Sequence, residues 1–533
     1  MKIDEIPYVK TGYFSKLMCD YLEEKNNLIP FYNRFPSIEN FEAQIKEKQN
    51  NFSVSNRVVL SDALQKQYSR VDISTYTQDN ITLLKNENTF TIVTGHQLNL
   101  FTGPLYFLYK IISTINLAKE LKNKHPDYDF VPVYWMATED HDFDEINYFN
   151  LNGKKIQWNK EASGGVGRLN TEGLDILSET LSAELGGSQN AEFLKDLFKK
   201  AYLNNDNLTD ATRYLANELF KEYGLVIVDG DDTSLKQLLI PFVKLDLLEE
   251  KSFKTVTQSI EKLNDLPENY AIQVNPREIN YFYLIDGVRE RIIEKDGMFF
   301  INDTTLKFSK EEMLTELEQH PERFSPNVVC RPLYQEVILP NLCYIGGGGE
   351  LAYWLELKAY FEAVNITFPM LLLRNSALIV KEKQQEKLEK LDLKIEHLFL
   401  KQNTFINKKI REISNIDIDF KDQKEHLQNQ FKGLYVLAEQ TDKSFLGAVK
   451  AQEVKQLKGL DALEKRLLKA QKRKLKDHVI RITEIQNELF PNQSLQERQA
   501  NFSEFYLEYG EELIPALVAN LKPLSKNFKV ITF

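Results

Sequence analysis

The sequence predicts an α/β protein with a parallel-sheet core, two inserted regions and a long antiparallel α-helical coiled coil. Three observations lead to this prediction. Apolar runs of strand length alternate with helical stretches, which is typical of a parallel sheet. Turn-rich segments of alternating polarity interrupt these runs twice. Residues 377–490 contain no proline and carry apolar residues at spacings of three and four, as a coiled coil does.

Composition narrows the class of protein. The chain has 533 residues, enough for two to four domains, and its net charge of −11 argues against a nucleic-acid binder as a whole. Three cysteines are too few for a disulfide scaffold, so a reducing cytoplasm is the expected location. The first residues lack the apolar stretch of a signal peptide, and no run reaches the roughly 18 apolar residues of a membrane span.

The first part of the core is expected at residues 1–147. Residues 1–88 have helix-like apolar spacing at 14–24, 38–49 and 60–68. Thr89–Gly95 then reads as a buried strand, Gly103-Pro104 opens a helix to about Lys124, and Asp129–Ala137 reads as a second strand. Strand, helix and strand form a βαβ unit, which is almost always parallel and right-handed.

The remaining segments follow in order. We expect a first insertion at 148–207, core at 208–265 with a strand at 224–229, and a β-rich second insertion at 266–324 with turns at 286–287 and 296–297. The last core part, 325–376, contains a strand at 368–373. The coiled coil follows at 377–490, divided into two long helices by a break at 416–421. The tail, 491–533, ends in a strand at 528–533 and is expected to dock on the core.

Gly95-His96-Gln97 stands at the end of the first strand, just before a helix. The carboxyl ends of parallel strands form the binding edge of an α/β sheet, and a helix N-terminus favours anions. His96 is therefore a candidate phosphate-binding residue, and Gly103 would allow close approach of the backbone. The alternative is a histidine that merely caps the loop.

Thr138–Glu145 follows the second strand and contains five carboxylates and a histidine. Carboxylates and imidazole could ligate Mg²⁺ or a transition metal, and one carboxylate could act as a general base for an attacking amine. The alternative is a solvated acidic turn. The two loops belong to one βαβ unit, so we expect them to face the same crevice.

A third motif, Asn327–Glu350, is expected to close this crevice. Gly346–Gly349 precedes a helix and resembles a phosphate cradle, but a tight, close-packed turn explains the glycines equally well. Arg331 would suit a carboxylate, because a planar guanidinium binds both oxygens. The basic run Lys465–Lys476 could contact RNA, although the solvated face of a coiled coil is the preferred interpretation.

Together, TGHQLNLFTGPLYFLYK, PVYWMATEDHDFDEIN and SPNVVCRPLYQEVILPNLCYIGGGGELAYW resemble the bacillithiol-biosynthesis cysteine ligase (BshC) family over essentially the whole chain. The resemblance implies a Rossmann-like core related to class I aminoacyl-tRNA synthetases, two connecting-peptide insertions and a coiled coil that mediates homodimerisation. It also implies ATP-dependent joining of cysteine to glucosaminyl-malate through an amide bond, the last step of bacillithiol synthesis.

The chain departs from the synthetase pattern. It has no HxGH motif and no KMSKS-like lysine loop near Arg374-Asn375, so activation through an adenylate or through an acyl phosphate stays open. Mg²⁺ could accompany ATP, and no clear zinc ligand set is present. Two other functions remain in view: a nucleotide-binding protein whose coiled-coil arm touches RNA, and a non-catalytic dimeric scaffold.

These arguments assign the candidate site residues, without assigning metal ligands. The catalytic candidates are His96, Asp140, His141 and Asp142. The nucleotide-binding candidates are Gly95, Gln97, Thr102, Gly103, Gly346, Gly347 and Gly348. The substrate-binding candidates, for cysteine and glucosaminyl-malate, are Asn99, Trp135, Glu139, Asn327, Arg331, Gln335, Glu350 and Tyr353.

Overall fold

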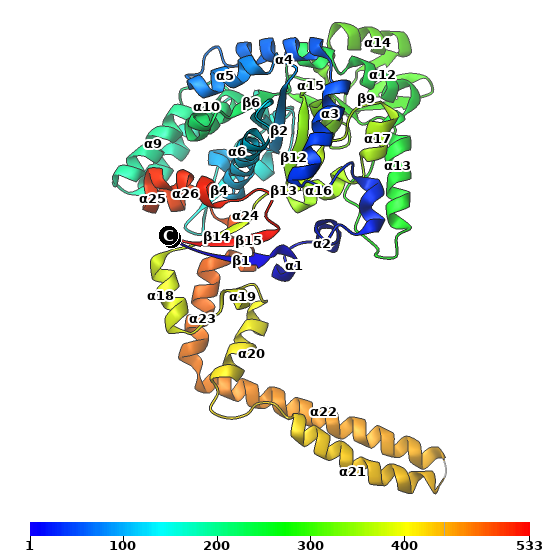
Figure 1. The fold of residues 1–533 in the computed structure, drawn as a ribbon, viewed down its shortest axis with the longest axis vertical. Coiled ribbons are helices and arrows are strands. Elements are labelled where there is room, and N and C mark those ends of the chain that lie inside the picture. Colours follow the sequence, from blue (N-terminus) through cyan, green and yellow to red (C-terminus); the bar gives the residue numbers. More distant parts are fainter. Residues whose placement is uncertain (442) are drawn as a thin grey trace. The chain divides into compact units, whose positions relative to one another are not determined.

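The computed structural model describes residues 1–441 and 443–533 (Figure 1). The chain divides into two compact units. The larger unit comprises Asp4–Leu378 and Gln496–Val530, and the smaller comprises Met1–Ile3, Ile379–Leu495 and Ile531–Phe533. Among the described residues, no helix has both the length and the apolar character needed to cross a membrane.

A five-stranded parallel sheet forms the core of the larger unit, in the order β13-β12-β2-β3-β6. Its strands are β2 (Thr89–His96), β3 (Asp129–Met136), β6 (Val226–Asp229), β12 (Asn341–Gly346) and β13 (Met370–Leu373). Every residue of β2 is buried, which fits its β-branched and aromatic residues. The strands predicted at β2, β3, β6 and β13 are confirmed, whereas β12 was not predicted.

Helix α6 (Tyr106–Lys124) connects β2 to β3, as the βαβ prediction required. Its residues Leu117, Ala118 and Leu121 join the buried apolar cluster of the sheet. The helix begins later than the predicted Gly103-Pro104. Phe101, Thr102 and Gly103 have φ angles of 48°, 69° and 62°, which no α-helix accommodates.

The N-terminal segment contains the three predicted helices, α2 (Lys16–Leu22), α3 (Phe41–Asn51) and α4 (Val54–Gln67). It also contains β1 (Lys2–Pro7) and α5 (Thr75–Leu83), which were not predicted. Helix α4 supports the sheet through Arg57, which is buried and donates to the carbonyl oxygens of Thr89 (2.7 Å) and Leu84 (3.4 Å). This segment therefore fixes the start of β2.

The region of the first insertion begins with a hairpin and continues with helices. The elements are β4 (Tyr148–Leu151), β5 (Lys154–Gln157), α8 (Leu174–Leu185), α9 (Gln189–Tyr202) and, directly after it, α10 (Leu208–Phe220). Between β5 and α8 lies a glycine loop, Ser163–Gly167. The backbone N–H groups of Val166 and Gly167 donate to the carbonyl oxygens of Asp140 (2.7 Å) and Thr138 (2.8 Å). This loop therefore holds the segment that follows β3.

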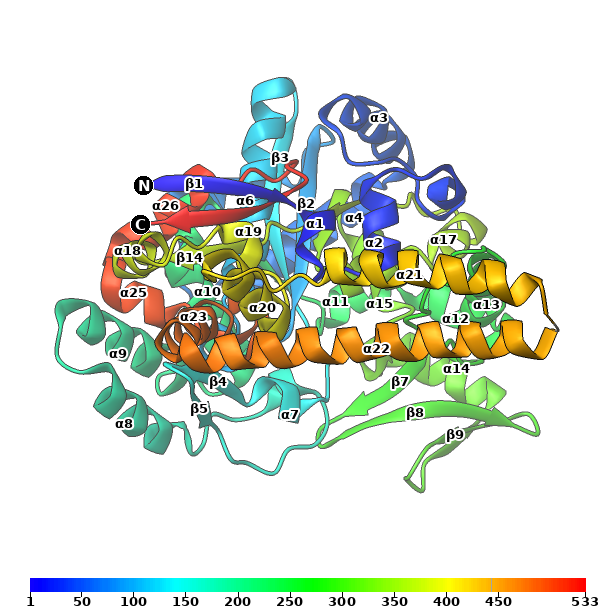
Figure 2. The ribbon, with the colours of Figure 1, turned by 90° about the horizontal axis from the view of Figure 1, so that it is seen from below.

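The second insertion forms a β-meander, as its turns predicted. After α11 (Thr233–Gln237), α12 (Ile240–Glu249) and α13 (Lys251–Asn264), a five-stranded sheet has the order β10-β9-β8-β7-β11. The strands are β7 (Tyr281–Ile285), β8 (Val288–Lys295), β9 (Met298–Ile301), β10 (Lys307–Ser309) and β11 (Phe324–Pro326), with α14 (Lys310–Gln319) before β11. Figure 2 shows β7, β8 and β9 side by side.

The last core elements are α15 (Arg331–Ile338), α16 (Gly348–Trp354) and α17 (Lys358–Ala363), followed after β13 by β14 (Ala377–Val380). The tail contains α24 (Gln496–Gln499), α25 (Ser503–Tyr509), α26 (Leu513–Asn520) and β15 (Asn527–Thr532). Within the larger unit, the Lys529 N–H donates to the Ser376 carbonyl (3.0 Å) and the Tyr8 N–H to the Lys526 carbonyl (3.2 Å). The tail thus returns to the core.

The smaller unit is helical, with α18 (Glu382–Lys390), α19 (Ile395–Leu398), α20 (Gln402–Ile413), α21 (Lys421–Glu439), α22 (Lys443–Lys474) and α23 (Lys476–Leu489). Helices α21 and α22 are antiparallel: Lys424 pairs with Glu464 (2.8 Å), and Tyr435 donates to Glu453 (2.7 Å). The predicted antiparallel pair is confirmed.

The predicted position of the reversal was wrong. The break at 416–421 separates α20 from α21, where Asp417 and Asp419 side chains accept backbone N–H groups two residues ahead and form turns. The reversal lies between Glu439 and Lys443. In the basic run, Lys469, Arg473 and Lys474 are exposed whereas Leu468 is buried, which fits the solvated-face interpretation.

Candidate active site

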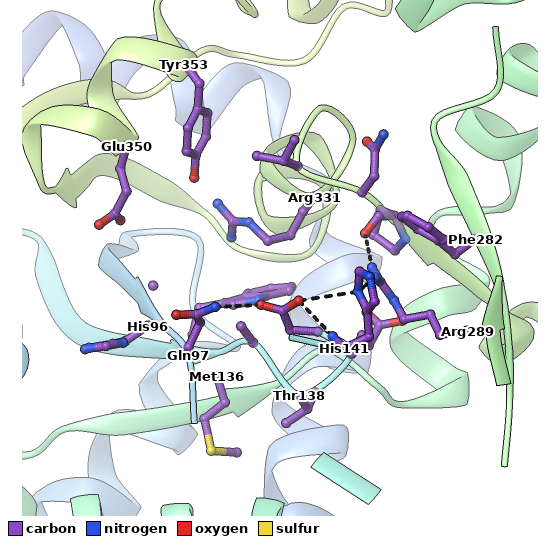
Figure 3. A pocket seen from close by; sticks show the side chains of 18 of the residues that line it. His96, Gln97, Met136, Thr138, His141, Phe282, Arg289, Arg331, Glu350 and Tyr353 are labelled. Carbon is purple, nitrogen blue, oxygen red and sulfur yellow. Dashed lines mark hydrogen bonds and ion pairs between the residues drawn. The ribbon is translucent and has the colours of Figure 1, made fainter. Parts of the chain in front are cut away.

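A cavity of about 620 Å³ opens at the carboxyl ends of β2 and β3 and extends to the second insertion (Figure 3). The predicted residues that line it are Gly95, His96, Gln97, Trp135, Glu139, Asp140, His141, Asn327, Arg331, Glu350 and Tyr353. Those that do not are Asn99, Thr102, Gly103, Asp142, Gln335, Gly346, Gly347 and Gly348. The three predicted motifs therefore meet at one crevice, although parts of each lie outside it.

His96 is the last residue of β2 and is 7% exposed. Its ring stacks on Tyr106 at 5.4 Å, with 9° between the ring planes. Burial, together with the positive charges of Lys110 and Arg374, lowers the pKa of His96 well below its ordinary value. Its Nε2 is buried and has no hydrogen-bond partner among the described residues. His96 is thus a neutral imidazole at neutral pH, in the wall of the cavity.

The buried Lys110 and the partly buried Glu350 form an ion pair beside His96. Lys110 Nζ lies 2.6 Å from Glu350 Oε1 and donates to the Gly95 carbonyl at 2.7 Å. Glu350 also accepts from the Tyr344 hydroxyl (2.8 Å) and from the Gly347 N–H (3.3 Å). Burial alone would raise the pKa of Glu350, but the charge and hydrogen bond of Lys110 outweigh it and lower the pKa. Glu350 is therefore a carboxylate that is already occupied by protein groups.

Lys110 was not identified from the sequence. The sequence offered one clue to its role: it is the lysine of the otherwise apolar run Leu105–Ile112, and α6 buries it. A buried lysine requires a partner, so it could have been assigned to the strand edge that α6 faces. Its partner, however, is 240 positions along the chain and only the fold brings the two together.

Arg331 begins α15 and lies between the aromatic walls of the cavity. Its guanidinium carbon is 5.8 Å from the Trp135 ring centroid and 5.7 Å from the Tyr344 ring centroid. Its Nη1 donates to Gln335 Oε1 (3.2 Å), and the Tyr353 hydroxyl lies beside the guanidinium. Gln335 is buried outside the cavity, so its role is to position Arg331.

The carboxylates of the acidic run after β3 do not form one cluster. Glu139 forms an ion pair with the buried Lys236, and burial raises the pKa of Glu139 despite this partner. Asp140 accepts from Gln97 Nε2 (2.9 Å) and from the His141 N–H (2.8 Å), whereas Asp142 is exposed. In the described part of the chain, no group of three or more metal-ligating side chains is placed to hold an ion.

His141 lies opposite the second insertion, where its Nδ1 is 2.6 Å from Arg289 Nη1 (Figure 3). A guanidinium can only donate, so Nδ1 accepts and the ring proton is on Nε2. Phe282 completes the group, with the Arg289 guanidinium 4.1 Å above its ring. Arg289 and Phe282 were not predicted, because they belong to an insertion that the sequence did not connect to the site.

The loop with Thr102 and Gly103 packs away from the cavity. Asn501 Nδ2 donates to the carbonyl oxygens of Phe101 (2.8 Å) and Gly103 (2.6 Å). A Cβ atom on Gly103 would lie 2.5 Å from Asn99 Cβ, so the glycine is required by this packing. Asn99 itself donates to the Glu145 carbonyl (3.2 Å). These residues therefore shape the loop behind His96.

The glycine run before α16 is a close-packed turn. A Cβ atom on Gly346 would lie 3.0 Å from Tyr344 Cε1, and one on Gly348 would lie 3.1 Å from Met18 Cγ. Gly347 caps α16 with Glu350, whose side chain accepts the Gly347 N–H. The arrangement supports the tight-turn alternative, and it explains how Glu350 reaches Lys110.

Comparisons with known proteins cover the whole chain. Residues 1–375 match the family model for the bacillithiol biosynthesis BshC N-terminal Rossmann-like domain, and residues 377–533 match that for the BshC C-terminal coiled-coil domain. The relative from Christiangramia forsetii is 63% identical over 99% of this chain and 98% of its own, and the one from Flavobacterium johnsoniae is 61% identical over 100% of both. A relative from Bacillus thuringiensis is 29% identical over 99% of both chains. All three carry the name "Putative cysteine ligase BshC". The chain belongs to the bacillithiol-biosynthesis BshC family.

Proposed function

We propose that the protein is an ATP-dependent cysteine ligase that joins cysteine to the amine of glucosaminyl-malate, the last step of bacillithiol biosynthesis. Family membership and the names of the relatives support a ligase of this kind. The observation that carries the proposal is the cavity itself: a neutral histidine, a buried lysine and an arginine converge where the strands end.

The reaction has two stages. A cysteine carboxylate oxygen attacks a phosphorus atom of ATP and displaces either pyrophosphate or ADP. The sugar amine then attacks the activated carbonyl carbon, loses a proton and releases AMP or phosphate. Both stages develop negative charge on oxygen, and stabilising such charge is usually the largest catalytic contribution.

Each residue of the cavity has a role that follows from its position. His96 donates a ring N–H to a phosphate oxygen, and Lys110 supplies positive charge behind it. Arg331 holds the cysteine carboxylate between Trp135 and Tyr344. Asp140, held by Gln97, accepts the amine proton. Mg²⁺ would enter bound to the ATP phosphates, because the described residues offer no ligand set of their own.

The direct test measures ATP consumption by the full chain with cysteine and glucosaminyl-malate, each alone and together. We expect turnover only with both, an amide product by mass spectrometry, and a loss of about 100-fold for His96→Ala. His125→Ala is the matched control, because His125 lies at the far end of α6. The nucleotide product, AMP or ADP, identifies the intermediate. Turnover that neither substrate stimulates and that His96→Ala leaves unchanged would exclude the proposal.

We further propose a cytoplasmic homodimer formed through the coiled coil. The pair α21–α22 exposes apolar side chains, among them Leu434 (42%), Leu437 (51%) and Leu463 (52%). Such exposure on a hairpin of long helices favours a helical partner. Sedimentation of the full chain should give twice the monomer mass, and Leu437→Glu should reduce it to one.

A further inference from the structure

Three arginines of the second insertion line one end of the cavity. Arg289 and Arg291 alternate along β8, so both point to the same face of the meander. Phe282 on β7 is the register partner of Arg291 in β8. The Arg289 guanidinium carbon lies 4.1 Å from the centroid of the Phe282 ring. Arg277 reaches the same cavity from the segment before β7, where its N–H is held by Asn280 Oδ1 (3.0 Å).

Among the described residues, no carboxylate forms an ion pair with these arginines, although Glu139 and Asp140 act on Arg289 through their charge. Arg289 donates to the Ser325 hydroxyl (3.1 Å) and the Pro326 carbonyl (3.4 Å), and meets His141 Nδ1, all neutral acceptors. In the part of the chain that the structure describes, neither Arg277 nor Arg291 forms an ion pair. Unpaired guanidinium groups that face one cavity favour an anionic ligand.

Three carboxylates line the cavity, and two of them, Glu350 and Glu139, form ion pairs with lysines, although the charges of Glu139 and Asp140 also act on Arg289. Glu350 is paired with Lys110, and Glu139 with Lys236. Asp140 accepts hydrogen bonds from Gln97 and from a backbone N–H. Arg277 and Arg291 form no ion pair in the described part of the chain, so this end of the cavity carries positive charge that a ligand can use.

The two ends of the cavity are chemically distinct (Figure 3). Arg289, His141 and Phe282 lie on one side, His96 and Glu350 lie on the other, and Arg331 lies between them. A guanidinium binds a carboxylate through two parallel N–H groups, so several of them match a ligand with two carboxylates. The His96 end has a neutral ring, and the two cations that act on it, Lys110 and Arg374, are already paired with Glu350 and Glu497.

We propose that Arg277, Arg289 and Arg291 form a dicarboxylate-binding subsite that holds the acid end of the amino-sugar acceptor. The assignment rests on the proposed ligase function for the identity of that acceptor. It also gives the second insertion a role in the reaction, because arginines that fix the acid end direct the amine toward Arg331 and Asp140.

The test is calorimetric titration of the full chain with L-malate as the probe, alongside acetate and inorganic phosphate. We expect malate to bind more tightly than acetate. Arg289→Ala and Arg291→Ala should each weaken malate binding roughly 10- to 100-fold, the range for a lost charged hydrogen bond. The lysine variants at both positions should recover part of the loss. Arg70→Ala, at an exposed position, should bind as the wild type does.

The outcomes separate the subsite from the overall function. Malate that binds no more tightly than acetate, or Arg289→Ala that binds malate as Arg70→Ala does, overturns the subsite. The subsite is also overturned when the arginine variants lose phosphate affinity to the same extent as malate affinity. If malate binding depends on the arginines while no ligase turnover is found, the subsite stands and the proposed function fails. Tryptophan fluorescence of each variant confirms that it is folded.

Discussion

Replacing Lys110 by methionine tests whether the ion pair beside His96 supports the core. The substitution keeps the length of the side chain and removes its charge. Glu350 would retain the Tyr344 hydroxyl and the Gly347 N–H but lose its only cation within 4 Å among the described residues. Breaking a buried pair from one side costs about 3–5 kcal/mol. Because the Glu350 side chain is 27% exposed, we expect about 3 kcal/mol.

Urea unfolding followed by tryptophan fluorescence measures this cost. The three tryptophans, at 135, 158 and 354, all belong to the larger unit, so the signal reports that unit. Lys119→Met, at an exposed position of the same helix, is the control and should change stability by less than about 0.5 kcal/mol. The double variant with Glu350→Gln should lose less than the two single variants combined. Equal midpoints for the two lysine variants would refute the reasoning.

Three further outcomes are expected. Burial raises the pKa of Glu356 to about 7 from its ordinary 4.5, so the folded state holds a proton that the unfolded state releases between these pH values. As pH rises from 4.5 to 7, the free energy of unfolding of the wild type should therefore fall by about 3 kcal/mol relative to that of Glu356→Gln. Parallel pH profiles of the two proteins would contradict this. Gly167→Ala should lower the free energy of unfolding by about 1–3 kcal/mol, because the added Cβ atom would crowd the loop after β3. Gly187→Ala is the control: its Cβ atom would have no neighbour within 4 Å, so its stability in the same urea assay should be unchanged. Glu497→Gln should lower the free energy of unfolding by about 3–5 kcal/mol, because the buried Arg374 loses its carboxylate at 2.8 Å. An unchanged unfolding midpoint would argue against that role.

The strands that could be predicted are those whose burial produces a continuous run of apolar or β-branched residues. Both β2 and β13 are of this kind, and each is entirely buried. Strand β12 is different: Asn341 begins it and a run of glycines follows it, so its few apolar residues resemble a loop. Its identity as a strand depends on pairing with β2 and β13, which no local pattern records.

The site was predictable where a side chain lies at the carboxyl end of a strand or a few residues after it. His96 and Asp140 were located in this way, and the fold places both at the cavity. Lys110 and Arg289 were not found, because a helix and a separate insertion carry them to the site. The alternation Arg289-Glu290-Arg291 was a usable signal for one charged face of a strand, but it does not reveal what that face meets.

The position of β2 in the sheet has a consequence for how the chain folds during synthesis. Thr94 of β2 donates its hydroxyl to the carbonyl of Ile345 in β12, and the two residues are 251 positions apart. The β2–α6–β3 unit is therefore synthesised long before the strand that covers its other edge. An apolar strand with an open edge pairs readily with other chains. Chains that end before residue 341 should accordingly aggregate, and translation through β12 is the step that closes the core.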